Sequence, residues 1–319
     1  MTVLVLRALG LGDLLTGVPA LRALADAFPG HRRVLACPRG LAPLVELIGA
    51  VDEVVDVEPL APLPERLRGI EIAVNLHGRG PRSHRTLLEL APRWLIAFAC
   101  PNAGVDEGPA WRPGEHEVER WCRLLAESGV PADPRRLDVA PPPLRVPEAL
   151  RGLTIVHPGA ASTARRWPAE RFAAVARAEA ATGRGAGGAG GGGARALAGE
   201  VARIAGLPAG AVLAGRTGLR ELAALVAAAA RVVCGDTGVA HLATAMRTSS
   251  VVLFGPVPPS RWGPPRDRPW HRVLWSGRTG DPHAAVTDPG LLEIDVADVL
   301  DALRALPPSG RGVEPAAAA

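Results

Sequence analysis

The chain reads Arg231-Val232-Val233-Cys234-Gly235-Asp236-Thr237-Gly238-Val239-Ala240-His241 where an apolar run meets the start of a helical run. A second apolar run follows directly, Ser250-Val251-Val252-Leu253-Phe254-Gly255-Pro256. Short, continuous apolar runs are typical of buried strands in a parallel sheet. The order strand, turn, helix, strand therefore predicts a βαβ unit.

The turn of this unit predicts a phosphate-binding site. Backbone N–H groups without an intrahelical partner converge at a helix start, and the helix dipole adds roughly half a positive charge there. Gly238 lies at this start, and Thr237 and His241 can donate hydrogen bonds. Asp236 is the exception, because a carboxylate repels phosphate unless it caps the turn or binds a hydroxyl group.

The same alternation of short apolar and helical runs covers most of the chain. In the first half the runs are 3–6, 21–27, 33–36, 41–48, 53–57, 70–75, 82–90 and 95–99. In the second half they are 153–156, 169–181, 194–204, 211–214, 219–229 and 296–306. Strands that alternate with helices favour doubly wound parallel sheets. We predict two Rossmann-like domains facing a cleft, 1–143 and 144–306, divided near Pro141-Pro142-Pro143 and followed by a disordered tail, 307–319.

One segment interrupts this alternation where a strand is expected. It reads Gly183-Arg184-Gly185-Ala186-Gly187-Gly188-Ala189-Gly190-Gly191-Gly192-Gly193. Glycine costs about 0.5–1 kcal/mol per interior position relative to Ala and has no side chain to pack. We therefore predict a linker here instead of a strand. It is either a natural insertion or a local reading-frame error, and both weaken the expected nucleotide site.

Composition narrows the class of protein. Hydrophobic residues make up 48% of the 319 residues, which predicts a globular fold. Since no apolar run reaches about 18 residues and Met1 leads straight into a strand-like run, we expect no membrane span, no leader and a cytoplasmic protein. The four cysteines form no CxxC pair, which predicts reduced core thiols.

The charge balance argues against a nucleic-acid partner. The net charge is only +4, and no Arg-rich cluster is interleaved with aromatic residues. A basic face that contacts phosphorylated lipid head groups at the inner membrane surface fits this balance better.

Asp13 is the first candidate for chemistry. It ends the turn Gly10-Leu11-Gly12 after the strand-like run 3–6, at the carboxyl edge of the sheet, where open α/β folds bind ligands. Pro19 predicts that the main helix begins near Val18 with Thr16 as its cap. Asp13 would then lie on a turn, where it either caps the turn or faces the ligand. A dinucleotide fingerprint would need Gly at Leu15, which argues against a dehydrogenase.

A second candidate segment is His157-Pro158-Gly159-Ala160-Ala161-Ser162-Thr163-Ala164-Arg165-Arg166-Trp167-Pro168. Pro168 suits the first position of the next helix, so Arg165 and Arg166 precede its positive end. Two guanidinium groups there suit a diphosphate that gains charge as a sugar departs, although a solvated arginine pair is the alternative. Ser162 and Thr163 are further candidate phosphate ligands. Thr217 is a candidate for the base pocket.

A third segment follows a predicted strand of the first domain and reads Asn75-Leu76-His77-Gly78-Arg79-Gly80-Pro81-Arg82-Ser83-His84. Its candidates for binding an anionic acceptor, together with Gly12 of the first turn, are His77, Arg79, Arg82 and Ser83. His77 and His84 lack a third metal ligand, and no Asp-x-Asp occurs in the sequence. We therefore predict neither a metal nor a cofactor.

Two of these motifs resemble glycosyltransferase family nine, the heptosyltransferases. Asp236-Thr237-Gly238 with His241, the run 252–256 and Arg261-Trp262-Gly263-Pro264 resemble its C-terminal signature. Residues 7–15, followed by Pro19-Ala20-Leu21-Arg22, resemble its N-terminal motif. The similarity extends from residue 2 to about residue 300. It implies the two-domain GT-B architecture, Asp13 as the catalytic base and ADP-heptose as the donor. Related enzymes commonly carry Lys at the position of Arg165.

The sequence thus predicts an inverting, metal-independent glycosyltransferase. It would move a heptose-like sugar from a nucleoside-diphosphate donor to a hydroxyl group of a glycan, a lipid-linked acceptor or a natural product. Arg165 and the helix start at Gly238 would hold the diphosphate, and Asp13 would take the acceptor proton. Two alternatives stay open. A nucleotide-sugar epimerase would need further carboxylates in the C-terminal domain, and the glycine run motivates a non-catalytic nucleotide-sugar-binding protein.

Overall fold

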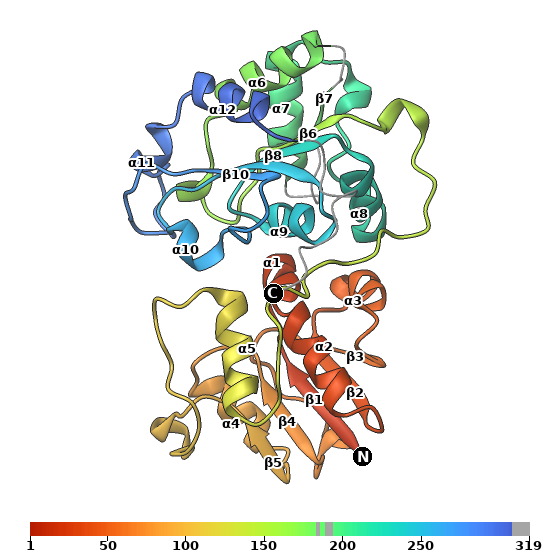
Figure 1. Cartoon of the computed structure of the whole chain (residues 1–319), viewed down its shortest axis with the longest axis vertical. Helices are drawn as coiled ribbons and strands as arrows, with labels where there is room; N and C mark the ends of the chain where they lie inside the picture. Colours follow the sequence, from red (N-terminus) through yellow and green to blue (C-terminus); the bar gives the residue numbers. More distant parts are fainter. Residues whose placement is uncertain (183–185, 189–193, 308–319) are drawn as a thin grey trace. The chain divides into compact units, whose positions relative to one another are not determined.

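The computed structural model describes residues 1–182, 186–188 and 194–307. The chain forms two compact units, of which the first is Met1–Val139 and the second begins at Ala140 (Figure 1). Each unit contains one five-stranded sheet in which every strand pair is parallel. The predicted fold class, two doubly wound parallel α/β sheets, is confirmed.

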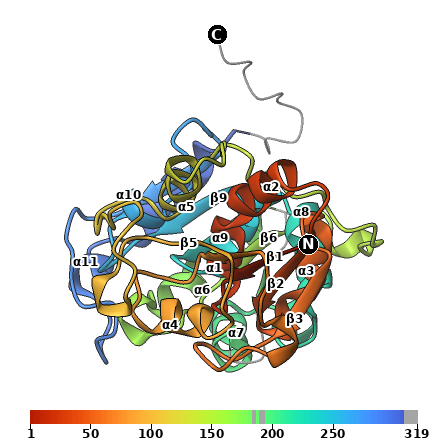
Figure 2. The same cartoon turned by 90° about the horizontal axis from the view of Figure 1, so that it is seen from below.

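The sheet of the first unit has the strand order β3-β2-β1-β4-β5. Its strands are β1 (Thr2–Leu6), β2 (Arg32–Cys37), β3 (Glu53–Asp56), β4 (Ile72–Asn75) and β5 (Trp94–Ile96). Its helices are α1 (Leu11–Thr16), α2 (Val18–Ala27), α3 (Ala42–Ile48), α4 (Arg82–Leu88) and α5 (Glu117–Glu127). Helices α2 and α5 pack side by side on one face of this sheet, and α4 covers the other (Figure 2). The four C-terminal residues of β1 are buried, as its apolar sequence Thr-Val-Leu-Val-Leu predicts.

The sheet of the second unit has the order β10-β9-β8-β6-β7. Its strands are β6 (Thr154–His157), β7 (Ala186–Gly188), β8 (Arg231–Gly235), β9 (Ser249–Leu253) and β10 (His271–Leu274). Its helices are α6 (Ala169–Ala181), α7 (Arg195–Ala205), α8 (Leu219–Ala228), α9 (Gly238–Ala245), α10 (Pro259–Trp262), α11 (Pro289–Leu292) and α12 (Val296–Arg304). Helices α6, α7 and α12 cover one face of the sheet, and α8 and α9 the other (Figure 1). The predicted unit β8–α9–β9 is present.

Both sheets reverse their winding direction between two adjacent strands. In the first unit this switch point lies between β1 and β4, and in the second between β6 and β8. Ligands of open α/β sheets bind beyond the carboxyl ends of the strands at such a point. The segments that follow β1, β4, β6 and β8 contain Asp13, His77, Arg165 and Asp236, respectively.

The prediction of a linker in place of a strand is wrong for Ala186–Gly188, which form β7. Thr154, Ile155 and Val156 of β6 pair with Ala186, Gly187 and Gly188. Backbone pairing with β6 needs no side chain, and a methyl group on Gly188 would lie only 3.0 Å from Cβ of Ala198 on α7. Glycine here permits close packing of the helix on the strand. The remaining residues of the glycine run lie outside the described part of the chain.

Two further expectations fall near this edge and at the end of the chain. Residues 211–214 do not form the predicted strand, because only Val212 makes an isolated bridge, to Gly188. The predicted tail is outside the described residues from 308 onward. Among the helices that the structure describes, none has the length and hydropathy that a membrane crossing requires.

A Gly187→Ala substitution is expected to stabilise the protein. The added methyl group would meet the Ala211 carbonyl oxygen at 3.4 Å and Cδ1 of Leu213 at 3.7 Å, which are ordinary contacts. We expect the free energy of unfolding to rise by about 0.5–1 kcal/mol in chemical denaturation, because Ala loses less backbone entropy than Gly. Gly188→Ala is the matched control and should destabilise, since it pushes α7 away. Equal effects of the two variants would contradict the described packing of β7.

Candidate active site

Asp13 lies on α1, between β1 and the long helix α2. The expectation of a turn is wrong here, because residues 11–16 form one short helix with Asp13 as its third residue. Asp13 is half-buried, and its Oδ2 accepts a hydrogen bond from the Gly10 N–H at 3.2 Å. The side chain therefore does cap the helix start. This contact involves one carboxylate oxygen, so it is compatible with a second role.

The environment of Asp13 raises its pKa. Burial is the largest cause, because it removes water from the charged form. The Arg7 guanidinium opposes this effect, and the negative charge of Glu117 adds to it. A carboxylate whose pKa is raised toward neutrality is a stronger proton acceptor than an ordinary surface aspartate.

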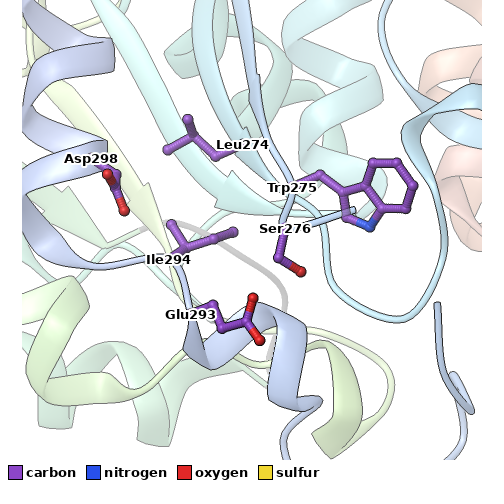
Figure 3. A pocket seen from close by; sticks show the side chains of 6 residues that line it. All are labelled: Leu274, Trp275, Ser276, Glu293, Ile294 and Asp298. Carbon is purple, nitrogen blue, oxygen red and sulfur yellow. The ribbon is translucent and has the colours of Figure 1, made fainter. Parts of the chain in front are cut away.

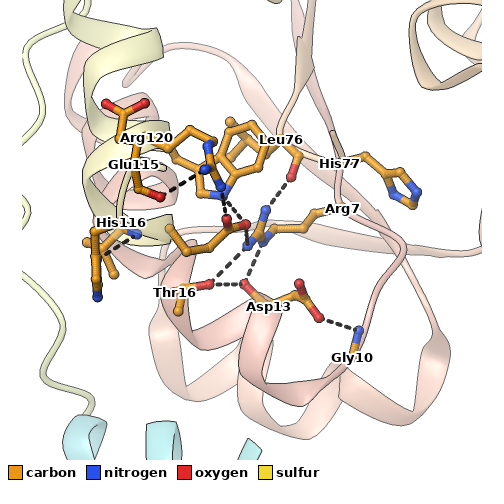
Figure 4. A network of polar contacts seen from close by, with 12 residues as sticks. Arg7, Gly10, Asp13, Thr16, Leu76, His77, Glu115, His116 and Arg120 are labelled. Atoms are coloured by element: carbon orange, nitrogen blue, oxygen red, sulfur yellow. Dashed lines mark hydrogen bonds and ion pairs between the residues drawn. The ribbon is translucent and has the colours of Figure 1, made fainter. Parts of the chain in front are cut away.

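Arg7 is the fully buried cation behind Asp13 (Figure 4). Its Nε donates to the backbone carbonyl of Asp13 at 2.5 Å, and its Nη1 donates to the carbonyl of Leu76. Its Nη2 donates to Oγ1 of Thr16 at 3.0 Å and to Oε1 of Glu117 at 3.3 Å. Thr16 donates in turn to the Asp13 carbonyl at 3.0 Å, whereas the N-cap position of α2, predicted for Thr16, is occupied by Gly17.

The loop after β4 is organised by the buried Asn75. Its Nδ2 donates to Oγ of Ser83 and contacts Nδ1 of His84, both at 3.0 Å, and its Oδ1 accepts from the His77 N–H. The Nε2 atom of His84 contacts the Phe98 carbonyl at 2.8 Å, so His84 is held on both ring nitrogens. Ser83, a predicted acceptor ligand, is buried within this network.

The other predicted acceptor residues differ in charge. His77 is half-buried, and desolvation together with Arg7 lowers its pKa to about 4. Its imidazole is therefore neutral near pH 7 and can exchange hydrogen bonds with a hydroxyl group. Arg79 and Arg82 are exposed, and Gly12 is part of α1. Arg79 and Arg82 are the cationic groups among the predicted acceptor residues.

In the second unit, the segment after β6 brings Arg165 to the segment after β8. Arg165 Nη1 lies 3.7 Å from Oδ2 of Asp236, whose side chain is only 8% exposed. Arg165 Nε is 3.5 Å from Oγ of Ser162, and that hydroxyl donates to the Pro282 carbonyl at 2.5 Å. The guanidinium of Arg165 thus offsets the negative charge that Asp236 places beside the predicted phosphate site.

The neighbouring Arg166 has a different environment. It is exposed, and its Nε and Nη2 donate to the Ala160 carbonyl at 3.1 and 3.0 Å. This bidentate contact joins two residues of the same loop, the one after β6. The Arg166 side chain therefore binds the loop backbone, whereas the Arg165 side chain contacts Asp236. Thr163 is exposed and begins the short 3₁₀ turn Thr163–Arg165, which Arg166 follows directly.

Thr237 and Gly238 lie at the beginning of α9, as predicted. Thr237 is the N-cap residue with extended backbone angles, and Gly238 is the first helical residue. His241 is in the first turn, and its ring packs edge-on against Trp262 with centroids 5.8 Å apart. Thr217 precedes α8, and its buried Oγ1 has no hydrogen-bond partner among the described residues.

The four cysteines are buried and free. Burial raises the pKa of Cys37 and of Cys122 to about 12, so both are unreactive thiols. Within the described ranges, no group of three or more His, Cys, Asp or Glu side chains is arranged to hold a metal ion.

A separate cavity of about 310 Å³ lies in the second unit, beside the edge strand β10 (Figure 3). It is lined by Leu274, Trp275, Ser276, Glu293, Ile294 and Asp298. None of the predicted donor-binding residues belongs to this lining.

Glu117 and the helix α5 that carries it are not among the elements predicted from the sequence. Val118, Trp121, Cys122 and Leu125 of α5 are buried at the spacing i, i+3, i+4 and i+7, which is a helical signal that the sequence contains. Nothing local indicates that Glu117 contacts Arg7, because 110 residues separate them. Arg7 itself could have been noted as a charge that directly follows a buried strand.

The fold and the two sets of side chains define a class of enzyme. Each unit is Rossmann-like, and charged side chains gather at the switch point of each sheet, which is the arrangement of a two-domain glycosyltransferase. A family model described as glycosyltransferase family 9 (heptosyltransferase) matches residues 108–278. The chain belongs to this family and is a glycosyltransferase. This assignment confirms the resemblance found in the sequence and removes the epimerase alternative.

Solved structures of similar fold cover nearly the whole chain. An E. coli ADP-heptose LPS heptosyltransferase II is 22% identical, with a TM-score of 0.75 over 96% of this chain and 98% of its own. A glycosyltransferase family 9 protein from Veillonella parvula is 19% identical, with a TM-score of 0.74 over 95% and 96%. The E. coli heptosyltransferase WaaC, solved with ADP, is 18% identical, with a TM-score of 0.71 over 95% and 99%. No protein of curated function matches the sequence.

Proposed function

We propose that the protein transfers a heptose-like sugar from a nucleoside-diphosphate donor to an acceptor hydroxyl group, with inversion at the anomeric carbon. The observation that carries this proposal is the pairing of Arg165 with Asp236 at the switch point of the second sheet, beside the start of α9. A guanidinium and a helix N-terminus together favour the diphosphate, most of all as it gains charge on leaving. This positive charge from the protein supports transfer without a metal ion.

Asp13 would act as the general base of this transfer. The acceptor would bind to the first unit, where Arg79 and Arg82 suit an anionic group and the neutral His77 suits a hydroxyl. Asp13 would take the proton as that hydroxyl attacks the anomeric carbon from the face opposite the diphosphate. A general base supplies about a hundred- to ten-thousand-fold in rate. The acceptor would be a glycan, a lipid-linked saccharide or a small natural product.

ADP-heptose is the proposed donor, by family membership and by the solved relatives that contain ADP. Ser162, Thr163, Thr237 and His241 would add hydrogen bonds to the phosphates or the sugar. Thr217, whose buried hydroxyl has no protein partner in the described part of the chain, would contact the nucleoside. The strand that Ala186–Gly188 form within the glycine run supports the catalytic proposal over the non-catalytic alternative.

Calorimetric titration with ADP, UDP, GDP and dTDP, alone and as sugar conjugates, tests this donor site. We expect ADP to bind at least about tenfold more tightly than the others, a difference of about 1.4 kcal/mol, and EDTA to leave its affinity unchanged. Tighter binding of another nucleotide would reject ADP-heptose as the donor. Loss of binding with EDTA would reject a metal-independent site.

Contact with the inner membrane surface would follow from a lipid-linked acceptor. The net charge of +4 and the exposed Arg79 and Arg82 support it. Co-flotation with anionic vesicles, absent with neutral ones, is the expected result, and no flotation with either would reject it.

A further inference from the structure

Arg7 connects three parts of the first unit that are distant in sequence. Its donors reach Asp13 and Thr16 of α1, the carbonyl of Leu76 in the loop after β4, and Glu117 of α5 (Figure 4). Leu76 immediately precedes His77. One buried side chain therefore fixes the segment with the proposed base against the segment with a proposed acceptor ligand.

Neighbouring residues fix the conformation of the Arg7 side chain. A methyl group on Gly17 would lie 2.9 Å from Arg7 Nε and 3.0 Å from its Cδ, so only glycine leaves room for the side chain. The guanidinium lies 4.9 Å from the ring centroid of Trp121 on α5. A fully buried cation needs a counter-charge, because desolvation otherwise costs several kcal/mol.

Glu117 is that counter-charge. It is 6% exposed and is the first residue of α5. Besides Arg7, its carboxylate accepts hydrogen bonds from Nε1 of Trp121 at 2.8 Å and from Arg120. Arg120 is itself held by the Glu115 carbonyl at 2.8 Å and stacks 4.3 Å from the Trp111 ring centroid. Glu117 thus has a fixed position as well as a charge.

We propose that the buried pair Arg7 and Glu117 positions the general base: Arg7 holds α1 and the acceptor loop in register, and Glu117 sets how much of the Arg7 charge acts on the Asp13 carboxylate. This inference rests on the proposed role of Asp13 and extends it to two positioning residues. Neither residue touches the substrate in this proposal.

The charges around Asp13 determine in which direction its pKa should change when Glu117 is neutralised. Arg7 faces Asp13 from the segment after β1 and lowers its pKa, whereas Glu117 faces it from α5 and raises it. Arg120 is paired with Glu117 on the same helix, and His77 from the loop after β4 is neutral near pH 7. Removing the Glu117 charge has two effects: Asp13 loses a repelling negative charge, and the Arg7 charge is less compensated. Both effects stabilise the ionised Asp13 carboxylate and shift its titration to lower pH.

The test is a ¹³C NMR titration of the Asp13 carboxyl carbon in the full-length protein, with the signal assigned by its loss in Asp13→Asn. Glu117→Gln removes the charge but keeps an oxygen that can accept from Trp121. Glu119→Gln is the matched control, because it removes the same charge from the exposed side of the same helix. We expect a lower Asp13 pKa in Glu117→Gln and no change in Glu119→Gln. An unchanged or raised pKa in Glu117→Gln would overturn the proposal.

This readout needs no acceptor, so it is independent of the proposed function. If the titration shifts as expected but Asp13→Asn keeps full transfer activity, the base assignment fails and the charge coupling stands. If Glu117→Gln does not fold, the transfer kinetics of Arg7→Lys test the positioning role instead. One ammonium cannot replace four guanidinium contacts, so we expect kcat for transfer to fall by about tenfold to a hundredfold with unchanged ADP affinity. Full kcat in Arg7→Lys would overturn the positioning role.

Discussion

Asp13→Asn is expected to lower kcat for sugar transfer by about a hundred- to ten-thousand-fold while leaving the Kd for ADP unchanged. The amide is similar in shape to the carboxylate and can still accept the Gly10 N–H bond that Asp13 Oδ2 accepts at 3.2 Å. It cannot take a proton from the acceptor hydroxyl. The predicted effect is therefore confined to the chemical step, and it is measured by product formation at saturating donor together with calorimetric ADP binding.

The stability of this variant provides the control. A carboxyl group whose folded pKa is raised disfavours the folded state at pH values where the unfolded chain is ionised. Asn has no charge to desolvate, so Asp13→Asn should not lower the midpoint of thermal unfolding at pH 7. A strong loss of stability or of ADP affinity would make Asp13 a structural residue. Full transfer activity would exclude it as the base.

The same shift predicts the pH dependence of the wild-type enzyme. The proposed mechanism needs the ionised Asp13 carboxylate, and burial raises the pKa of this group above its ordinary value of 3.8. The acid limb of kcat/KM should therefore have its midpoint above that value. His77, with its pKa lowered to about 4, stays neutral through the physiological range and should add no separate limb there.

The order of apolar and helical runs in the sequence predicts those elements of the fold that depend on neighbouring residues. The unit β8–α9–β9 was visible because two apolar strands flank a glycine-containing helix start, and α6 has the predicted bounds Ala169–Ala181. Strand β7 was not visible, because its place is set by pairing with β6 and by the close approach of α7, which a run of glycines does not reveal. Residues 211–214 show the reverse case, an apolar run that gains only one bridge.

The sites divide in a similar way. Arg165, Asp236 and Gly238 could be proposed from the sequence because each lies at a strand end or helix start that the pattern defines. The charge states could not be proposed, because they depend on distant residues. His77 is neutral through burial and Arg7, and Asp13 is influenced by Glu117 from α5. Contacts across such sequence separations exist only once the sheet has formed.

Arg165→Ala is expected to weaken ADP binding by about tenfold to a hundredfold. A hydrogen bond to a charged group contributes about 1.5–3 kcal/mol, and each 1.4 kcal/mol is tenfold in affinity. The substitution also removes the guanidinium that lies 3.7 Å from Oδ2 of Asp236, so the Asp236 charge repels the diphosphate more strongly. Both effects have the same sign. Calorimetric titration with ADP at fixed ionic strength measures their sum.

Two matched variants separate charge from geometry at this position. Arg166→Ala removes the adjacent guanidinium, which donates twice to the Ala160 carbonyl and should therefore contribute less to ADP binding than Arg165. Arg165→Lys keeps the charge but loses the planar fork, so it should recover part of the affinity that Arg165→Ala loses. If Arg165→Ala binds ADP as the wild type does, or if Arg166→Ala loses more affinity than Arg165→Ala, the diphosphate does not lie at Arg165. The part of the affinity that Lys recovers measures the contribution of positive charge beside Asp236, and the part that it does not recover measures the contribution of the planar guanidinium.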